Sequence, residues 1–498
     1  MNKPIYVGLA TAKMSRLIIA SILLVVAGRV FNAGAQTETN LHSFGSSPTD
    51  GRYPQAGLVQ GSDGNFYGTT LQGGTNTNCR DGCGTVFRIS PSGSNTTLYS
   101  FAGSPNDGNY PGGVLVQGSD GNFYGTSFYG GTSANCNGGC GTVFRISPSG
   151  SEMTLYSFVG STNDGFNPSS VLVQGGDGNF YGTTYSGGTN GDGTVFRISP
   201  SGSETNLHIF GGQPNDGYAP NGLVQGSDGN FYGTAQGGGT QNHGTVFRIS
   251  PNGSYTNLYS FGGPNDGGGP EGVLVHGSDG NFYGTTQKGG TNDIPSGGRG
   301  TVFRISPDGS YTNLYSFGSS PSDGTEPQGG VVQGSDGNFY GTTEDGGTND
   351  IPDGGLGTVF RITPNGSYTS LYSFGSPNDG YYTVAGLVQG SDGNFYGTTQ
   401  QGGTNNYGTV FKLTVPLNPP PYPINQITGV QVSETNIVFT IPSIAYETYQ
   451  LQFSSSMTPT NWINVPVSVT NSIGALLTVT NFGGASQPQG FYRFDITP

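Results

Sequence analysis

The seven-residue stretch DGNFYGT occurs seven times in this 498-residue chain, and no other feature restricts the fold as strongly. The copies begin at Asp63, Asp120, Asp177, Asp228, Asp279, Asp336 and Asp392, so they lie 51 to 57 residues apart. A motif that returns at a nearly fixed interval is typical of repeat proteins, in which one supersecondary unit packs against copies of itself. Aromatic residues make up 12% of the chain and charged residues only 9%, which is not the composition of a disordered segment.

Each unit contains four short apolar segments in a fixed order, and we name them strands a to d. In the first unit they read LVQ, FYGTT, TVFRI and TTLYSF, separated by Gly, Pro, Asn, Asp and Ser, which favour turns. Asp-Gly between strands a and b predicts a two-residue type I′ hairpin, and Ser-Pro-Ser-Gly connects c to d. The unit is therefore predicted to be a four-stranded antiparallel meander, which is one blade of a β-propeller.

Strand d is offset from the other three strands. Its first copy, at residues 41–44, precedes the first strand a, whereas the seventh unit ends at strand c, near Val410, without a strand d. An N-terminal strand that pairs with the last strand c would close the ring and remove an exposed sheet edge. We therefore expect an all-β fold, with a seven-bladed β-propeller over residues 36–415 that is closed by its N-terminal strand. An open linear solenoid is the alternative.

The units, which read LVQGSDGNFYGTT, GGT, GTVFRISPSG and LYSF in order, resemble the tandem repeat of the GloVer (Gloeo/Verruco) family of exported bacterial proteins over residues 41–415. The strand order is also similar to the blades of NHL and SMP-30-like propellers. The first resemblance implies export and a propeller-like fold, and it brings no established biochemical activity with it. SMP-30-like lactonases carry unlike carboxylate and amide metal ligands on different blades, and we identify no such set on the inner strands here.

Three further segments are predicted outside the repeat. Arg16, an apolar run over residues 17–27 and the exit Ala33-Gly34-Ala35 predict a signal peptide, residues 1–35, cleaved after Ala35. The mature protein is then expected to be secreted or held at the cell surface, without a membrane span. Residues 416–425 read as a Pro-rich linker. Residues 426–498 resemble fibronectin-III-like modules and predict a small β-sandwich of immunoglobulin-like fold.

Four cysteines form the pairs CRDGC and CNGGC at equivalent places in two adjacent units: Cys79, Cys83, Cys136 and Cys140. In an exported protein, such short-range pairs predict the local disulfides 79–83 and 136–140. A zinc site is the alternative, but no second pair or histidine is suitably placed for one.

Two repeated positions carry charge. An Asp in each d-to-a loop lies on the same face as the variable b-to-c loops, where binding residues are commonly found, and its carboxylate suits calcium or sugar hydroxyls. These candidate ligand residues are Asp50, Asp107, Asp164, Asp216, Asp266, Asp323 and Asp379. The basic position in strand c is expected to be structural, with the Asp of DGN as its partner, because a buried charge needs one. These residues are Arg88, Arg145, Arg197, Arg248, Arg304, Arg361 and Lys412.

The sequence favours a binding scaffold over an enzyme. Seven nearly identical blades present seven similar residues, whereas catalysis needs unlike groups in unlike roles, and we identify no catalytic residue and no metal site. The net charge of −14 argues against a nucleic-acid partner. We therefore expect a secreted, non-enzymatic propeller without a cofactor, calcium excepted, that binds an extracellular glycan or protein through its variable loops. The alternatives are an exported metal-dependent hydrolase or lactonase, and a structural surface or matrix protein.

Overall fold

The structure is a computed structural model, and it describes residues 7–9, 36–168, 170–213, 215–263, 265–291, 299–320, 322–348, 355–376, 378–415, 429–432, 437–442, 447–454, 463–471, 476–481 and 490–497. All regular structure in these residues is β, and no helix long and apolar enough to cross a membrane occurs among them. The chain divides into two compact units, Ala35–Pro416 and a second one that combines Met1–Gly34 with Leu417–Pro498.

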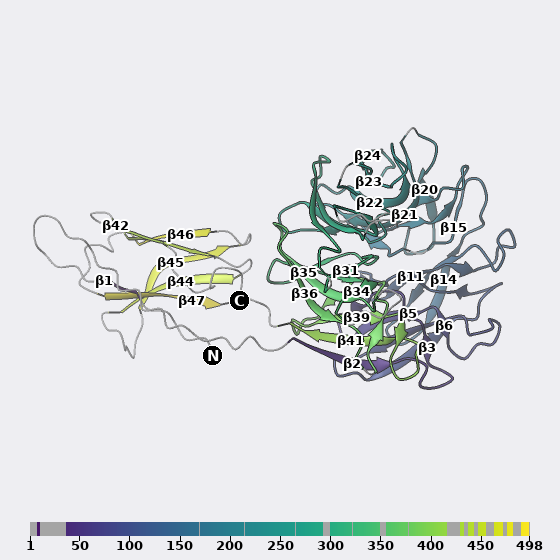
Figure 1. The fold of residues 1–498 in the computed structure, drawn as a ribbon, viewed down its shortest axis with the longest axis horizontal. Coiled ribbons are helices and arrows are strands. Elements are labelled where there is room, and N and C mark those ends of the chain that lie inside the picture. Colours follow the sequence, from purple (N-terminus) through teal and green to yellow (C-terminus); the bar gives the residue numbers. More distant parts are fainter. Residues whose placement is uncertain are drawn as a thin grey trace, which may run out of the picture. The chain divides into compact units, whose positions relative to one another are not determined.

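The first unit is a seven-bladed β-propeller, as the repeat predicted (Figure 1). Each blade is a four-stranded antiparallel sheet in the order a, b, c, d. The a strands are β4 (Val59–Gln60), β10 (Val116–Gln117), β16 (Val173–Gln174), β21 (Gly217–Gln225), β26 (Val275–His276), β32 (Val332–Gln333) and β38 (Val388–Gln389). The b strands are β5 (Phe66–Thr70), β11 (Phe123–Ser127), β17 (Phe180–Thr184), β22 (Phe231–Gly238), β27 (Phe282–Thr286), β33 (Phe339–Thr343) and β39 (Phe395–Thr399).

The outer half of each blade is made of strands c and d. The c strands are β7 (Thr85–Ile89), β13 (Thr142–Ile146), β19 (Thr194–Ile198), β23 (Thr245–Ile249), β29 (Thr301–Ile305), β35 (Thr358–Ile362) and β41 (Thr409–Thr414). The d strands of blades 1 to 6 are β8 (Asn95–Ser100), β14 (Glu152–Ser157), β20 (Glu204–Ile209), β24 (Tyr255–Ser260), β30 (Tyr311–Ser316) and β36 (Tyr368–Ser373). In blade 7 this place is taken by β2 (Thr37–Ser43), which pairs antiparallel with β41, so that His42 lies opposite Val410 (Figure 1).

Short two-stranded ladders join the d-to-a loop to the start of the b-to-c loop in six blades. They are β3 (Gly51–Arg52) with β6 (Gln72–Gly73), β9 (Gly108–Asn109) with β12 (Tyr129–Gly130), β15 (Gly165–Phe166) with β18 (Ser186–Gly187), β25 (Gly267–Gly268) with β28 (Lys288–Gly289), β31 (Gly324–Thr325) with β34 (Asp345–Gly346), and β37 (Gly380–Tyr381) with β40 (Gln401–Gly402). In blade 4 the corresponding segments are continuous with β21 and β22.

The turn between strands a and b differs from the predicted two-residue type I′ hairpin. The Gly64 N–H donates to the Gly61 carbonyl, and the Gly61 N–H donates to Asn65, so the loop has three residues. Only Gly64 has a positive φ, at 81°, and Asp63 does not. This is the arrangement of a turn followed by one left-handed residue, which needs glycine at a single position. Asp63 instead accepts hydrogen bonds, 3.1 Å from the Asn65 backbone nitrogen and 2.9 Å from the Tyr67 hydroxyl.

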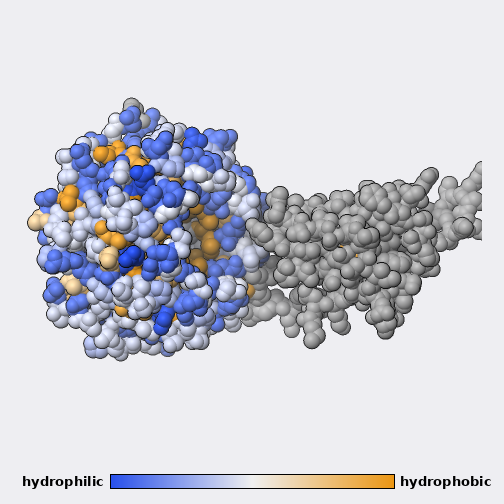
Figure 2. All heavy atoms as spheres, turned by 180° about the vertical axis from the view of Figure 1, so that it is seen from behind, coloured by the Kyte–Doolittle hydropathy of each residue, from blue (hydrophilic) through white to orange (hydrophobic). Residues whose placement is uncertain are grey.

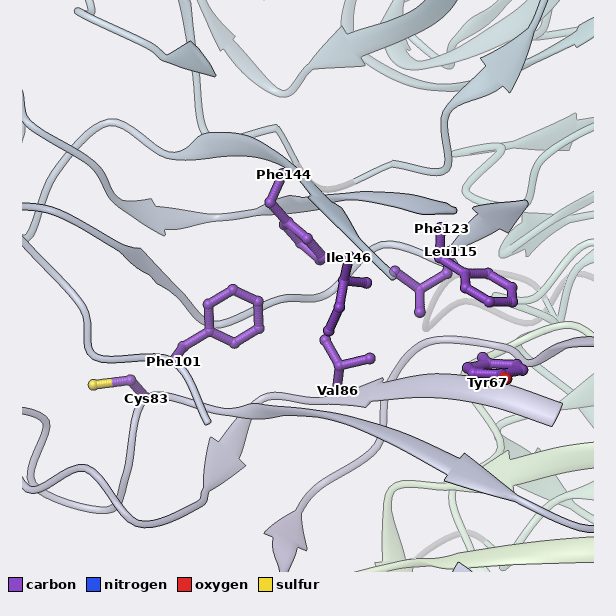
Figure 3. Packing of buried hydrophobic residues seen from close by; sticks show 8 residues of the cluster. All are labelled: Tyr67, Cys83, Val86, Phe101, Leu115, Phe123, Phe144 and Ile146. Atoms are coloured by element: carbon purple, nitrogen blue, oxygen red, sulfur yellow. The ribbon is translucent and has the colours of Figure 1, made fainter. Parts of the chain in front are cut away.

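Alternate residues of strand c serve two different seams between blades. Val86 belongs to a buried cluster with Leu115, Phe144 and Ile146 of blade 2 (Figure 3). Phe87 and Ile89 of the same strand belong to a cluster with residues of blade 7. Because side chains alternate along a strand, both faces of TVFRI are buried, and each blade supplies half of two cores. A blade cannot bury its apolar surface alone, and the ring is the stable unit.

Two repeated contacts join every pair of neighbouring blades. The Tyr of DGNFYGT stacks on the Phe of the next copy, with ring centroids 3.8 to 4.1 Å apart at all seven seams, including Tyr396 on Phe66 where blade 7 meets blade 1. At six seams the Gln of strand a accepts a hydrogen bond of 2.8 to 3.2 Å from a backbone N–H in the preceding blade's a-to-b turn. We call the latter set the glutamine belt. His276 occupies the seventh belt position, between blades 4 and 5.

The second unit contains two antiparallel sheets in its described residues. One has the order β1 (Val7–Leu9), β47 (Gly490–Thr497), β44 (Glu447–Ser454) and β45 (Ile463–Asn471). The other has the order β42 (Gly429–Val432), β43 (Ile437–Pro442) and β46 (Leu476–Asn481). The fibronectin-III-like sandwich stays a prediction. The linker at 416–425, and the predicted signal peptide apart from Val7–Leu9, lie outside the described residues.

Candidate functional site

The seven predicted ligand aspartates all lie in the d-to-a loops. Each directly precedes the glycine that begins the next strand, and each is at most 9% exposed. Each carboxylate accepts hydrogen bonds from its own loop. Asp107, for example, accepts from the backbone N–H of Gly108 at 2.7 Å and of Ala102 at 2.7 Å, and from the Tyr99 hydroxyl at 2.9 Å. The carboxylate thus satisfies loop N–H groups that would otherwise be buried without an acceptor. Their binding of calcium or of sugars stays a prediction.

The basic residues of strand c lie near the opposite face. Arg88 is half-buried and pairs across the sheet with Tyr67, whose hydroxyl donates to Asp63. Burial raises the pKa of Asp63, but hydrogen bonds from Asn65 and Tyr67, with the charge of Arg88, outweigh it and leave that pKa lowered. Within the described chain, no Arg or Lys side chain lies within 4.0 Å of a carboxylate as an ion pair; the ion pairs found there join His42 to Asp50 and His208 to Asp216.

The two predicted disulfides are confirmed. Cys79 is bonded to Cys83, and Cys136 to Cys140. The sulfur atoms lie directly over the glycines of the adjacent d-to-a loops, Gly103 and Gly160, where a Cβ would come within about 3 Å of them. The disulfides therefore support the variable b-to-c loops of blades 1 and 2 against the neighbouring loop.

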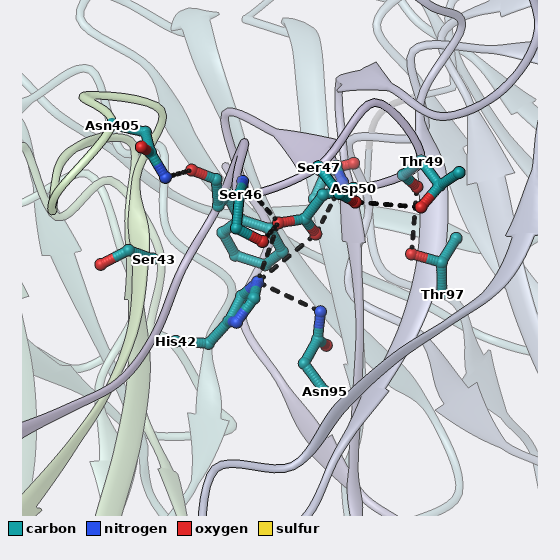
Figure 4. Close-up of polar contacts among 12 residues, drawn as sticks. His42, Ser43, Ser46, Ser47, Thr49, Asp50, Asn95, Thr97 and Asn405 are labelled. Carbon is teal, nitrogen blue, oxygen red and sulfur yellow. Dashed lines mark hydrogen bonds and ion pairs between the residues drawn. The ribbon is translucent and has the colours of Figure 1, made fainter.

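A cleft of about 610 Å³ opens at the outer rim between blade 7 and blade 1, and Figure 4 shows its polar contacts. His42 of β2 lies at its centre, with Nε2 at 3.1 Å from Asp50 Oδ2 and at 3.1 Å from Asn95 Nδ2. Burial raises the pKa of Asp50, but His42 and Ser46 outweigh it, so the pKa is lowered. Its carboxylate is therefore ionised at neutral pH and can only accept hydrogen bonds. Asn95 Oδ1 is buried and has no hydrogen-bond partner among the described residues.

A second cleft, of about 620 Å³, lies at the equivalent place between blades 4 and 5. In this cleft, aromatic rings stand where the first cleft has the His42 imidazole and the Asn95 amide. The rings of Tyr259 and Tyr311 stack with their centroids 4.3 Å apart. The Tyr259 hydroxyl donates to Asp266 at 2.9 Å. The Tyr311 hydroxyl and Asn313 Oδ1 are buried, and neither makes a hydrogen bond of normal geometry to a described residue. Each cleft thus holds one predicted aspartate and at least one unsatisfied polar atom.

A row of residues that the sequence analysis did not identify also breaks the repeat. Three amide and carboxylate pairs follow one another across blades 4 to 6: Gln236 with Glu271, Gln287 with Glu326, and Gln328 with Glu344. Burial and the neighbouring Asp345, Glu326 and Glu271 raise the pKa of Glu344 to about 7. The signal was present in the letters PEG, EPQ and TED, where other units have small or uncharged residues at equivalent places. Nowhere in the described ranges do three or more His, Cys, Asp or Glu side chains form a group that could hold a metal ion.

The propeller surface seen in Figure 2 is mostly hydrophilic or near neutral, with small separate hydrophobic groups. The large apolar side chains with the greatest exposure are Met153, Val159, Tyr185 and Tyr218, at 39 to 51%. Large apolar patches usually mark protein interfaces, and the face seen in Figure 2 has only small separate hydrophobic groups.

Comparison with known proteins identifies the family. The model of the Gloeobacter/Verrucomicrobia repeat matches residues 26–138, 126–320 and 278–418. No curated protein matches the sequence. Among solved structures, a luciferin-regenerating enzyme is 12% identical, with a TM-score of 0.39 and coverage of 63% of this chain and 92% of that one. A puromycin hydrolase is 14% identical, with a TM-score of 0.45 and coverage of 82% of this chain and 62% of that one. Because the family model matches most of the chain, the protein belongs to the Gloeobacter/Verrucomicrobia repeat family.

Proposed function

We propose that the protein is a secreted, non-enzymatic propeller that binds extracellular glycans in the clefts at its outer rim. The two disulfides support an oxidising location outside the cytoplasm, and we infer removal of residues 1–35 after Ala35 on export. The clefts lie between a d-to-a loop and the d strand of the next blade, on the face with the variable loops. Rigid blades thus hold the variable polar loops in place, which is the common arrangement of a binding surface.

The observation that carries the proposal is the unsatisfied acceptor in each cleft. Asn95 Oδ1 and Asn313 Oδ1 are both removed from solvent without a donor. Leaving a buried polar atom unpaired costs about 1–3 kcal/mol, and a ligand hydroxyl would recover that energy. Sugars supply several hydroxyl donors, and their C–H faces suit aromatic rings such as those of Tyr259 and Tyr315 in the cleft between blades 4 and 5.

The dimensions of the clefts favour one or two sugar units in each. Such a contact alone is weak, but two clefts on one rigid ring can engage one polymer. Linked sites raise the overall affinity about 10²–10⁴-fold over a single site when the spacing suits the ligand. We therefore expect oligosaccharides or polysaccharides, with several copies of the recognised unit, to bind far better than monosaccharides.

A glycan array probed with the full chain tests this proposal. Asn95→Ala and Asn313→Ala each remove one unsatisfied amide, and each is expected to weaken binding of the positive glycans about 2–10-fold. Asn252→Ala, at an exposed turn on the opposite face, is the matched control. Equal affinity of all variants, or an array without positives, would reject glycan binding at the clefts and leave a protein partner or a self-associating matrix component.

A hydrolase that uses Glu344 is the second candidate, because burial and neighbouring carboxylates raise the pKa of Glu344 to about 7, which suits a general acid or base at neutral pH. Turnover of ester or lactone substrates by the full chain, abolished by Glu344→Gln, would support it. The same assay repeated with and without added calcium tests the metal-dependent version. No turnover in any arm would leave the binding function.

We make two further proposals about the architecture, one on ring closure and one on the C-terminal segment. We infer that β2 closes the ring in solution, since its pairing with β41 gives blade 7 a fourth strand. We also infer that residues 426–498 form a fibronectin-III-like β-sandwich, which would hold the propeller at the cell surface or matrix by its own binding. Removal of residues 36–45 tests the first point, and expression of residues 426–498 alone tests the second.

A further inference from the structure

The residue four positions before the Tyr or His of strand d lies next to the aspartate of the preceding d-to-a loop, and its chemistry differs around the ring. It is the first residue of strand d in blades 1 to 6, and in blade 7 it is Glu38, the second residue of β2. Between blades 7 and 1 this residue is Asn95, which contacts His42, which in turn contacts Asp50. At three seams it is a tyrosine that stacks on the ring of the preceding d strand, at centroid distances of 3.9, 4.3 and 4.1 Å for Tyr255, Tyr311 and Tyr368. At the remaining three seams it is a glutamate. The carboxyl pairs are then Glu38 with Asp379, Glu152 with Asp107 and Glu204 with Asp164.

The Glu38 pair lies at the seam between blade 6 and the closing strand β2. Asp379 is 7% exposed and already accepts four hydrogen bonds, from the Tyr372 hydroxyl at 2.9 Å and from three backbone N–H groups. Asn40 of β2 donates to the carbonyl of Asn378, directly before this aspartate, at 2.9 Å. The two segments therefore touch at the seam, and the half-buried Glu38 shares it with a carboxylate.

Among the described residues, the groups that face Glu38 provide no compensating positive charge. On the facing blade they are Asp379 and Tyr372. On β41, Leu413 lies opposite Glu38, and Lys412 lies opposite Thr39 and acts on Asp392. His42 of β2 contacts the other seam, at Asp50. Two neighbouring carboxyls without a cation cannot both ionise cheaply, so one of them retains its proton to a higher pH.

We propose that Glu38, on β2 beside the buried Asp379, is a proton-dependent latch on the ring: neutral Glu38 lets β2 rest against blade 6, and loss of its proton puts two carboxylates into one seam and loosens β2. Glu38 has this effect because of where it lies. In blades 1 to 6 strand d follows strand c through a short turn, whereas no such turn joins β2 to β41, and only non-covalent contacts hold it in blade 7: the pairing with β41, packing, and hydrogen bonds such as that of Asn40 with Asn378. Glu152 and Glu204 lie in equivalent pairs, but on strands tethered in this way, so their ionisation weakens seams without releasing a strand.

The direction with pH follows from the environment of these groups. Burial, and then the facing aspartate, raise the pKa of Glu38 from 4.5 to about 7, and the pKa values of Glu152 and Glu204 are raised in the same way. Because the folded state binds the proton more tightly than the unfolded chain, the stabilisation is complete below about pH 4.5 and is lost as the pH rises through about 7. The latch is closed in mildly acidic surroundings and loosened above neutrality.

Hydrogen exchange of the full chain at pH 5.5 and pH 8.0, corrected for the intrinsic exchange rate, tests the latch. Protection of Thr37–Ser43 is expected to fall about tenfold at the higher pH, because the ionisation of a half-buried carboxyl is partly screened by solvent. Glu38→Gln removes the titration and is expected to make protection independent of pH. Glu152→Gln is the matched control, which leaves the pH response of β2 intact.

Equal protection of β2 at both pH values in the unaltered protein would overturn the proposal, whatever the variants do. A pH response that survives in Glu38→Gln would also overturn it. If that variant does not fold, the unaltered chain still decides the question, because the proposal requires the pH response in β2 to exceed that in the d strands of the tyrosine seams.

Discussion

Phe44→Ala is expected to open the ring at one place. Phe44 is 0% exposed and packs in a buried cluster with Leu58, Phe66 and Phe87 of blade 1 and with residues of blade 7. Truncation of a buried Phe costs about 3–5 kcal/mol. At about 2.1 cal/mol/K per residue, a ring of this size unfolds with an entropy of about 0.8 kcal/mol/K, so the melting temperature should fall by about 4–6 °C.

Phe158→Ala is the matched control, because Phe158 directly follows strand d of blade 2, as Phe44 directly follows β2. It is also 0% exposed and packs in the equivalent cluster. Its effect on the melting temperature should be similar, since the same side chain leaves the same kind of cluster. Hydrogen exchange separates the two variants. Only Phe44→Ala should speed exchange in Thr409–Thr414, because β2 is the strand that covers this edge and no turn tethers it to β41.

Equal exchange of β41 in the two variants would refute the reasoning, since it would mean that β2 leaves the ring no more easily than a tethered strand. A fall in melting temperature below about 1 °C for both would refute the packing argument itself.

Three further predictions follow from the contacts between blades. His276→Gln should complete the glutamine belt opposite Ser227 and raise the free energy of unfolding by about 0.5–1 kcal/mol, and Gln117→His should lower it by a similar amount; urea midpoints measure both. Reduction of both disulfides should cost about 2 kcal/mol per bond while the blades stay folded, so far-UV circular dichroism should persist at a lower melting temperature. Tyr124→Phe should cost about 1 kcal/mol, because it removes the 2.9 Å hydrogen bond to Asp120 and keeps the stack on Phe180; an effect above about 3 kcal/mol would mean that the hydroxyl has another role.

Much of the fold could be predicted because one motif carries several contacts at once. In DGNFYGT, the Tyr stacks on the next blade, its hydroxyl binds the Asp, and the Gly makes the turn. Such a stretch tolerates little change. Because each blade contains one copy, the seven copies predict seven blades. The turn type could not be read from Asp-Gly alone, because a three-residue loop with one left-handed glycine uses the same two letters.

The site was less predictable because its residues act across seams. Asp107 and Glu152 lie 45 positions apart, and only the ring geometry places them together. The repeated aspartates are candidate ligands because their loops share a face with the variable loops, yet the structure buries their side chains, because loop N–H groups need an acceptor. The grouping of Glu271, Glu326 and Glu344 could not be predicted from the sequence, because each is a single departure from the repeat. Their proximity appears only when blades 5 and 6 are assembled.

The seam between blades 7 and 1 and the one between blades 3 and 4 differ mainly at the first residue of strand d, and this difference shows how the ring diversifies. Both have a histidine that contacts the loop aspartate, at 3.1 Å for His42 and 3.2 Å for His208. Tyr255 stacks on His208 with centroids 3.9 Å apart, whereas Asn95 stands at the equivalent place beside His42, where the cleft lies. Asn95→Tyr should therefore stack on His42 as Tyr255 stacks on His208, remove the unsatisfied Asn95 Oδ1 and leave the melting temperature unchanged or higher. Because Tyr311 stacks in the same way beside the cleft between blades 4 and 5, the substitution should convert the cleft at His42 into the aromatic type and change which glycans bind; an unchanged glycan-array profile would place the ligand elsewhere on the ring.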